Sequence, residues 1–94
     1  MRLEFAPEAR RDLFEIAGYI AHDNPIRAAS FVGELESVCR NLTAFPQAAP
    51  LRPDFGPGIR GLTHGAYAIF YSALTDKVRI ERVIHGSRDI PNLP

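Results

Sequence analysis

Two amphipathic segments separated only by the tripeptide Asp23-Asn24-Pro25 constrain the fold of this chain more than any other feature. On both sides of the tripeptide, apolar residues recur at the spacing of one helical face. Asn24 is a favoured N-cap residue and Pro25 suits the first helical position, so one helix is predicted to end and another to begin there. Two helices joined by so short a turn must lie antiparallel. Each has a single apolar face, so the hairpin needs a third surface to pack against.

The first helix is expected to begin near Pro7, whose fixed φ suits a first turn. Its apolar face is Ala9, Leu13, Ile16, Ala17 and Ile20. Asp12 and Glu15 lie opposite this stripe, so both carboxylates are expected to be solvated. The second helix is expected to end before Pro46. Its stripe is Ala28, Phe31, Val32, Leu35, Val38, Cys39, Leu42 and Phe45.

Four further segments read as β-strands. They are Leu3–Phe5, Ile59–Thr63, Tyr67–Ser72 and Lys77–His85. The third is apolar on both faces, which places it centrally in the sheet. In the last strand, Arg82 falls on the apolar phase, which predicts a β-bulge or a sheet edge there. The proline-rich residues 46–58 form a stiff loop that is either functional or a spacer.

The predicted fold is therefore a two-layer α+β domain with the order β-α-α-β-β-β. The helical hairpin packs on one face of a small, mostly antiparallel sheet, and the other face is left partly bare. The expected core residues are Leu13, Ile16, Ile20, Phe31, Leu35, Val38, Leu42, Ile69 and Phe70.

Composition narrows the classes of function. The 94 residues are expected to form a single domain, residues 1–94, with a formal net charge of zero, which argues against binding nucleic acid through bulk electrostatics. A single cysteine, Cys39, fits a reducing cytosol. No signal peptide and no apolar run of about 20 residues are present, so we expect a cytoplasmic protein without a membrane span.

The residues indicate no catalytic, metal or cofactor site. The three histidines have no i,i+4 partner, and the chain has neither a phosphate-binding glycine loop nor a nucleophile elbow. Cys39 lies in an apolar stripe and reads as a buried small side chain. His64 and Tyr67 flank a predicted turn and could share a surface with His85, where an acid–base pair for RNA cleavage is conceivable.

The segment Ile80–Asp89 concentrates titratable groups at a strand end. His85, Arg88 and Asp89 follow the strand closely, and Gly86 permits a sharp exit between them. These groups could form a functional site at the strand end. The alternative is a structural ion pair of Arg88 and Asp89 that pins the C-terminal tail, and the residues alone favour it.

Three ordered motifs resemble the ParE branch of the RelE/ParE toxin superfamily over nearly the whole chain. The first helix carries Pro7-Glu8-Ala9, Asp12-Leu13, Ile16 and Tyr19-Ile20. The second helix carries Asn24-Pro25, Ala28, Phe31-Val32, Leu35, Leu42 and Phe45-Pro46. The strands carry Tyr67, Ile69-Phe70-Tyr71, Val78, Ile80, Val83-Ile84-His85-Gly86 and Arg88-Asp89.

The resemblance implies a type II toxin that a cognate ParD-like antitoxin holds inactive by wrapping it with its C-terminal segment. Freed members of this branch poison DNA gyrase by binding and are not known to run chemistry of their own. The RelE-like branch instead cleaves mRNA on the ribosome. That branch typically has Arg after the central-strand Tyr and an aromatic or basic residue in a C-terminal extension. Here Ala68 follows Tyr67, and no Tyr, Lys or Arg follows Arg88.

The favoured hypothesis is thus a non-enzymatic gyrase inhibitor with no membrane partner and no specific DNA binding of its own. The expected target-binding residues are Arg60, Tyr67, His85, Arg88 and Asp89. Phe14 and Tyr19 lie off the main stripe of the first helix and are the expected antitoxin contacts. The alternatives are a ribosome-dependent endoribonuclease and a degenerate member that only binds its antitoxin.

Overall fold

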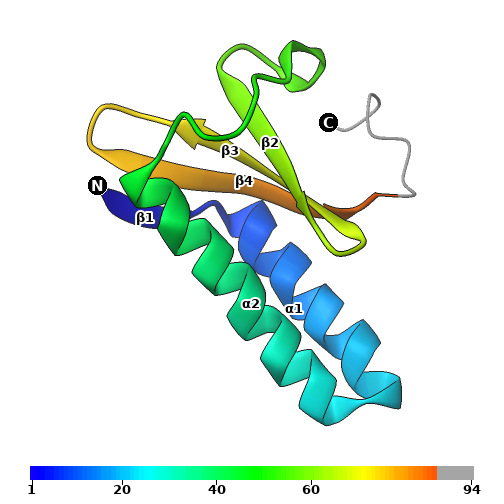
Figure 1. Ribbon diagram of the computed structural model, residues 1–94. Helices are drawn as coiled ribbons and strands as arrows, with labels where there is room; N and C mark the ends of the chain where they lie inside the picture. The colour runs from blue at the N-terminus through cyan, green and yellow to red at the C-terminus, as the bar shows by residue number, and fades with distance from the viewer. Residues whose placement is uncertain (87–94) are drawn as a thin grey trace.

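A helical hairpin packs on one face of a four-stranded sheet in the computed structural model, which describes residues 1–86 (Figure 1). The elements in chain order are β1 (Arg2–Phe5), α1 (Pro7–Asp23), α2 (Pro25–Ala44), the short 3₁₀ helix η1 (Pro53–Phe55), β2 (Ile59–His64), β3 (Tyr67–Ala73) and β4 (Lys77–His85). The predicted α+β class and the β-α-α-β-β-β order are confirmed. The end of the hairpin that carries the α1–α2 turn projects beyond the sheet (Figure 1).

Asn24 joins the two helices as the sequence predicts. Its backbone N–H donates to the Ile20 carbonyl at the end of α1, and its side chain accepts from the Arg27 N–H at the start of α2 at 3.0 Å. Prolines occupy the first turn of both helices, where a missing N–H costs nothing. One residue therefore satisfies backbone groups of both helix ends, which fixes the tight antiparallel hairpin.

The strand order is β1-β4-β3-β2, so β3 is an inner strand as predicted. β1 pairs with β4 in parallel, and the other two pairings are antiparallel. The register shifts where Tyr71 pairs with Ile80 but Phe70 pairs with Arg82, which leaves Glu81 as an extra residue. The predicted bulge at Arg82 is therefore confirmed, and β4 is also an edge strand beyond the end of β1.

The main core lies between the hairpin and the sheet. Five of the expected core residues are buried in it: Ile16, Phe31, Leu35, Leu42 and Ile69. Three others, Leu13, Ile20 and Val38, are partly buried against it. Phe70 is buried on the opposite face with Ala68 and Ile84, because alternate residues of a strand point to opposite sides.

The proline-rich loop covers part of that opposite face. The Phe55 ring lies 4.2 Å from the Phe70 ring, centroid to centroid. Backbone bonds tie the loop to the β2 edge, from Arg52 N to the Ile59 carbonyl and from Gly61 N to the Pro50 carbonyl. The sequence left open whether this loop is functional or a spacer. The structure shows it packing over the sheet, so the face is less bare than predicted.

Candidate binding surfaces

His64, Tyr67 and His85 form a row across three strands at one end of the sheet. His64 pairs with Tyr67, and Tyr67 pairs with His85, so the three side chains share one face. The His85 ring meets the Tyr67 ring edge-on at 5.2 Å between centroids. Phe31 of α2 packs beneath the row, 5.4 Å from the Tyr67 ring and 5.7 Å from the His64 ring. The expectation that both histidines share a surface with Tyr67 is confirmed.

Glu34 on α2 holds the His64 end of this row. Its carboxylate lies 2.9 Å from His64 Nε2 and also forms an ion pair with Arg27. The hydrogen bond from Arg27, followed by the one with His64, lowers the pKa of Glu34 to about 2. The pair ties the turn between β2 and β3 to α2. Sequence reasoning missed it because 30 residues separate the partners.

Tyr19 lies at the same end of the molecule. Burial raises the pKa of Tyr67, and its electrostatic interaction with Tyr19 raises it further. Tyr67 is only 9% exposed, whereas Tyr19 is 77% exposed. We call Tyr19, His64, Tyr67 and His85 the sheet-end surface.

Arg60 lies apart from this row, although the sequence grouped it with Tyr67 and His85. Its guanidinium is half-buried and donates to the Ala49 carbonyl at 2.7 Å. Tyr71, its cross-strand partner, donates from its hydroxyl to the Pro46 carbonyl at 2.9 Å. Both side chains therefore hold the start of the proline-rich loop. The remaining two expected target-binding residues, Arg88 and Asp89, lie outside the described residues.

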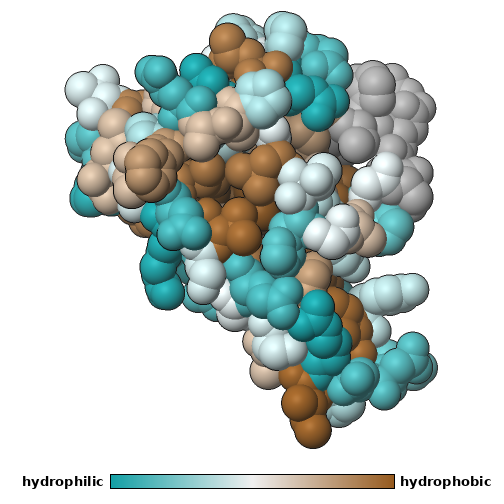
Figure 2. Space-filling view, viewed as in Figure 1, coloured by the Kyte–Doolittle hydropathy of each residue, from teal (hydrophilic) through white to brown (hydrophobic). Residues whose placement is uncertain are grey.

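A shallow apolar groove runs along the hairpin between α1 and α2. One part has a volume of about 490 Å³ and is lined by Phe14, Ala17, Gly18, Ala21, Pro25, Ala28, Ala29 and Val32. An adjoining hollow of about 360 Å³ shares Phe14, Ala17 and Val32 and adds Phe5, Arg10, Leu13 and Glu36. Phe14 is 82% exposed at the junction of the two. We call the two hollows the hairpin groove. Apolar residues gather along the projecting end of the hairpin (Figure 2).

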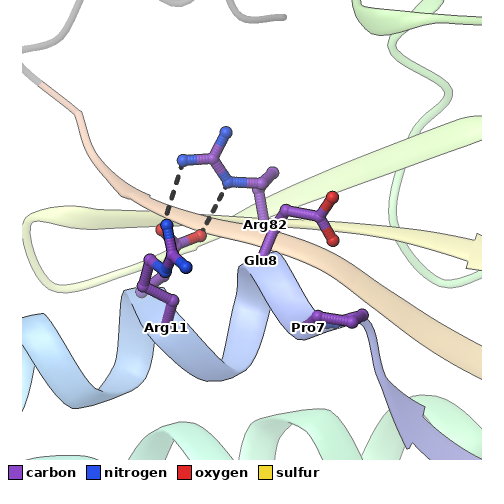
Figure 3. Close-up of a pocket in the computed structure, with 5 residues that line it drawn as sticks. Pro7, Glu8, Arg11 and Arg82 are labelled. Carbon is purple, nitrogen blue, oxygen red and sulfur yellow. Dashed lines mark hydrogen bonds and ion pairs between the residues drawn. The ribbon is translucent and has the colours of Figure 1, made fainter.

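Asp12 is not solvated, which corrects the expectation for the first helix. It is 8% exposed and accepts from Arg82 Nε at 2.8 Å and Arg82 Nη2 at 3.2 Å, bonds that Figure 3 marks with dashed lines. It also accepts from the Val83 N–H at 2.9 Å. β1 ends at Phe5, so α1 rather than a strand lies beside the rest of β4. A helix has a side that faces the sheet edge as well as one that faces the core, and the apolar stripe reveals only the second. Glu15 is exposed, as expected.

Comparison with known proteins identifies the family. The family model for the ParE toxin of the type II toxin–antitoxin system parDE matches residues 3–90. The chain belongs to the ParE toxin family.

Solved structures agree with the fold of this ParE-family toxin. A chain of the chromosomal ParDE toxin–antitoxin system from P. aeruginosa superposes with a TM-score of 0.78 at 22% identity, over 90% of this chain and 95% of that one. A chain of the toxin–antitoxin complex RelBE2 from Mycobacterium tuberculosis gives 0.63 at 26% identity, over 89% and 95% respectively. The comparison with curated proteins finds no significant match.

On the sheet face opposite the helical hairpin, charged side chains form ion pairs with one another. Lys77 Nζ lies 3.0 Å from the Glu4 carboxylate, and Arg79 Nε lies 3.0 Å from that of Glu81. Ser72 also donates to Glu81, at 2.8 Å. The cations on these strands therefore already have carboxylate partners.

The described part of the toxin offers neither a reactive thiol nor a cluster of metal ligands. Burial raises the pKa of Cys39 to about 12, so its nucleophilic thiolate form is suppressed. Among residues 1–86, no three His, Cys, Asp or Glu side chains lie close enough to hold a metal ion. No helix in that range is long and apolar enough to cross a bilayer.

Proposed function

We propose that this toxin inhibits DNA gyrase by binding it, and that a cognate ParD-like antitoxin neutralises it. The observation that carries the proposal is the sheet-end surface, where aromatic and imidazole side chains are held by packing and pairing. Interfaces draw most of their binding energy from a few such anchors. Here the accessible ones are the exposed Tyr19 and His85, with Tyr67 buried beneath them. Because Phe31 and Glu34 already order these side chains, little further entropy would be lost on binding.

A non-enzymatic mode of action fits the electrostatics of the described strands. RNA cleavage needs a base and cationic groups placed around the scissile phosphate. Lys77 and Arg79 pair with carboxylates, and Arg60 is engaged by loop carbonyls. Binding a large target needs no such free cations, which favours inhibition without chemistry.

The hairpin groove suits the amphipathic segment of an antitoxin. Small side chains line its centre and would let another helix approach closely, while Phe14 offers an exposed apolar anchor at its middle. Exposed apolar patches of this kind mark interaction sites. Tyr19, the second expected antitoxin contact, is exposed on the same helix as Phe14, so a segment that continues along α1 from the groove would reach it.

A gyrase supercoiling assay beside an in vitro translation assay tests the proposal. The purified toxin should block supercoiling and leave translation intact, and equimolar antitoxin should restore supercoiling. Cleavage of mRNA on ribosomes with supercoiling untouched would overturn the gyrase assignment and favour the nuclease alternative. Antitoxin binding without either effect would instead indicate a member that only binds its antitoxin.

A further inference from the structure

The bulge in β4 decides which face of the sheet His85 occupies. Before the bulge, Val78 and Ile80 point into the core under the hairpin, and after it Val83 does so. Side chains alternate along a strand, so an unbulged strand would place residues 82 and 84 on the hairpin side. His85 would then lie on the face opposite Tyr67. The sheet-end surface therefore includes His85 only in the bulged register.

The unbulged register has its own cost. It would turn the Arg82 side chain toward the apolar core beneath the helices and move Val83 to the other face. Burying a guanidinium without a carboxylate partner is strongly unfavourable. The Arg82 side chain thus contributes to the preference for the bulged register, provided that it finds a partner outside the core.

Asp12 adds a specific contact to the bulged register. The Ile80 carbonyl faces the α1 side of β4, where it accepts from Ala6 N–H at 2.9 Å. Without a bulge, residues 82 and 84 would present their backbone groups on that side. With the extra residue Glu81, Val83 does so instead, and its N–H reaches Asp12 at 2.9 Å.

The same carboxylate holds the displaced Arg82 side chain. Arg82 donates to Asp12 from Nε and Nη2. These bonds raise the pKa of Arg82, and Glu8 and Glu15 make smaller contributions. Arg11 lies beside the pair in the same shallow hollow (Figure 3). Among residues 1–86, Asp12 is the one charged residue that is buried.

We infer that Asp12 is a positioning residue that selects the bulged register of β4 and thereby places His85 beside Tyr67. The inference concerns the register itself, and only its consequence for gyrase inhibition rests on the proposed function. At the other end of the row, the Gly86 N–H donates to the Ala66 carbonyl at 2.7 Å, which completes the pairing that this register sets.

NMR on the purified toxin tests the inference directly. In Asp12→Ala, hydrogen exchange of the Val83 amide should become at least about tenfold faster than in the wild type, while exchange of neighbouring β3–β4 amides changes less. Cross-peaks between the Tyr67 and His85 rings should weaken or vanish. Asp12→Asn retains an acceptor oxygen for Val83 and should keep the ring contact. Glu15→Ala, an exposed carboxylate on the same helix, is the matched control and should change neither signal.

A double variant keeps the test decisive if Asp12→Ala fails to fold. Asp12→Ala combined with Arg82→Leu gives the unbulged register an apolar residue to bury, so His85 should move away from Tyr67 in a folded protein. An unchanged Tyr67–His85 contact in either folded variant would overturn the inference. Failure of the wild-type toxin to inhibit gyrase would contradict the proposed function alone, because the ring contact is measured without gyrase.

Discussion

The sheet-end surface and the hairpin groove differ in how their side chains are held. In the sheet-end surface, His64 is fixed by Glu34, and Tyr67 lies between Phe31 and His85. In the groove, small residues of two helices leave a hollow that exposed Phe14 borders. The first is ordered before a partner arrives, and the second offers apolar surface for a partner to bury. The two surfaces therefore offer a partner different physics, preordered side chains in one and apolar area to bury in the other.

The largest effect should come from removing the packing beneath the sheet-end surface. Phe31→Ala should lower the free energy of unfolding by about 3–5 kcal/mol, because Phe31 is buried against Tyr67 and the core. Phe14→Ala, an exposed aromatic on the other helix, should change it by about 0.5 kcal/mol or less. Urea denaturation of both variants measures the difference. A loss well under about 1 kcal/mol for Phe31→Ala would show that the helix does not support the surface.

A charge in the hairpin groove should separate antitoxin binding from stability. Phe14→Asp should weaken antitoxin affinity by at least about tenfold, because it places a carboxylate where an apolar partner would pack. Its melting temperature should stay near that of the wild type. Phe45→Asp is the matched control, since Phe45 is also exposed but does not line the groove. Intact co-purification of Phe14→Asp with the antitoxin would place the contact elsewhere.

A change at the sheet end should weaken gyrase inhibition and leave antitoxin binding nearly unchanged. His85→Ala should weaken gyrase inhibition about tenfold, the loss expected for an interface anchor, while antitoxin affinity in the groove changes little. Titrating the variant into a supercoiling assay gives the first quantity, and calorimetry with the antitoxin gives the second. Equal losses in both assays would show that the two surfaces are one interface.

The smallest effect should be the pH dependence of the Glu34 contact. The pKa of Glu34 is about 2 in the folded protein, below its ordinary value of 4.5. The contact therefore stabilises the fold above about pH 4.5, and this stabilisation is lost as pH falls toward 2. Glu34→Gln should therefore lower the melting temperature at about pH 6 and make little difference near pH 2. Glu36→Gln, which removes a looser exposed pair with Arg40, should show a much weaker trend. A pH-independent difference for Glu34→Gln would refute this account.

Local patterns predicted most of the architecture. Asn24-Pro25 marked the junction of the helices, apolar periodicity gave the core-facing stripes, and Arg82 on an apolar phase marked the bulge. Each of these signals arises from residues a few positions apart, so it can be read without knowing the fold. The family resemblance rests on the same local motifs.

The partners of charged side chains could not be predicted in this way. Asp12 contacts Arg82 and Val83 from 70 and 71 positions away, and Glu34 contacts His64 from 30 away. The pairing of Arg60 with loop carbonyls likewise depends on where the proline-rich loop folds back.

The sequence by itself determined the helices, the strand order along the chain, the bulge and the toxin family. Only the tertiary structure decided that Asp12 is buried at the β4 edge, that Arg60 holds a loop, and that His64, Tyr67 and His85 form one row. The physical reason is that periodicity and turn chemistry act within a few residues. Ion pairs and cross-strand rows are instead set by which elements the packed core brings together.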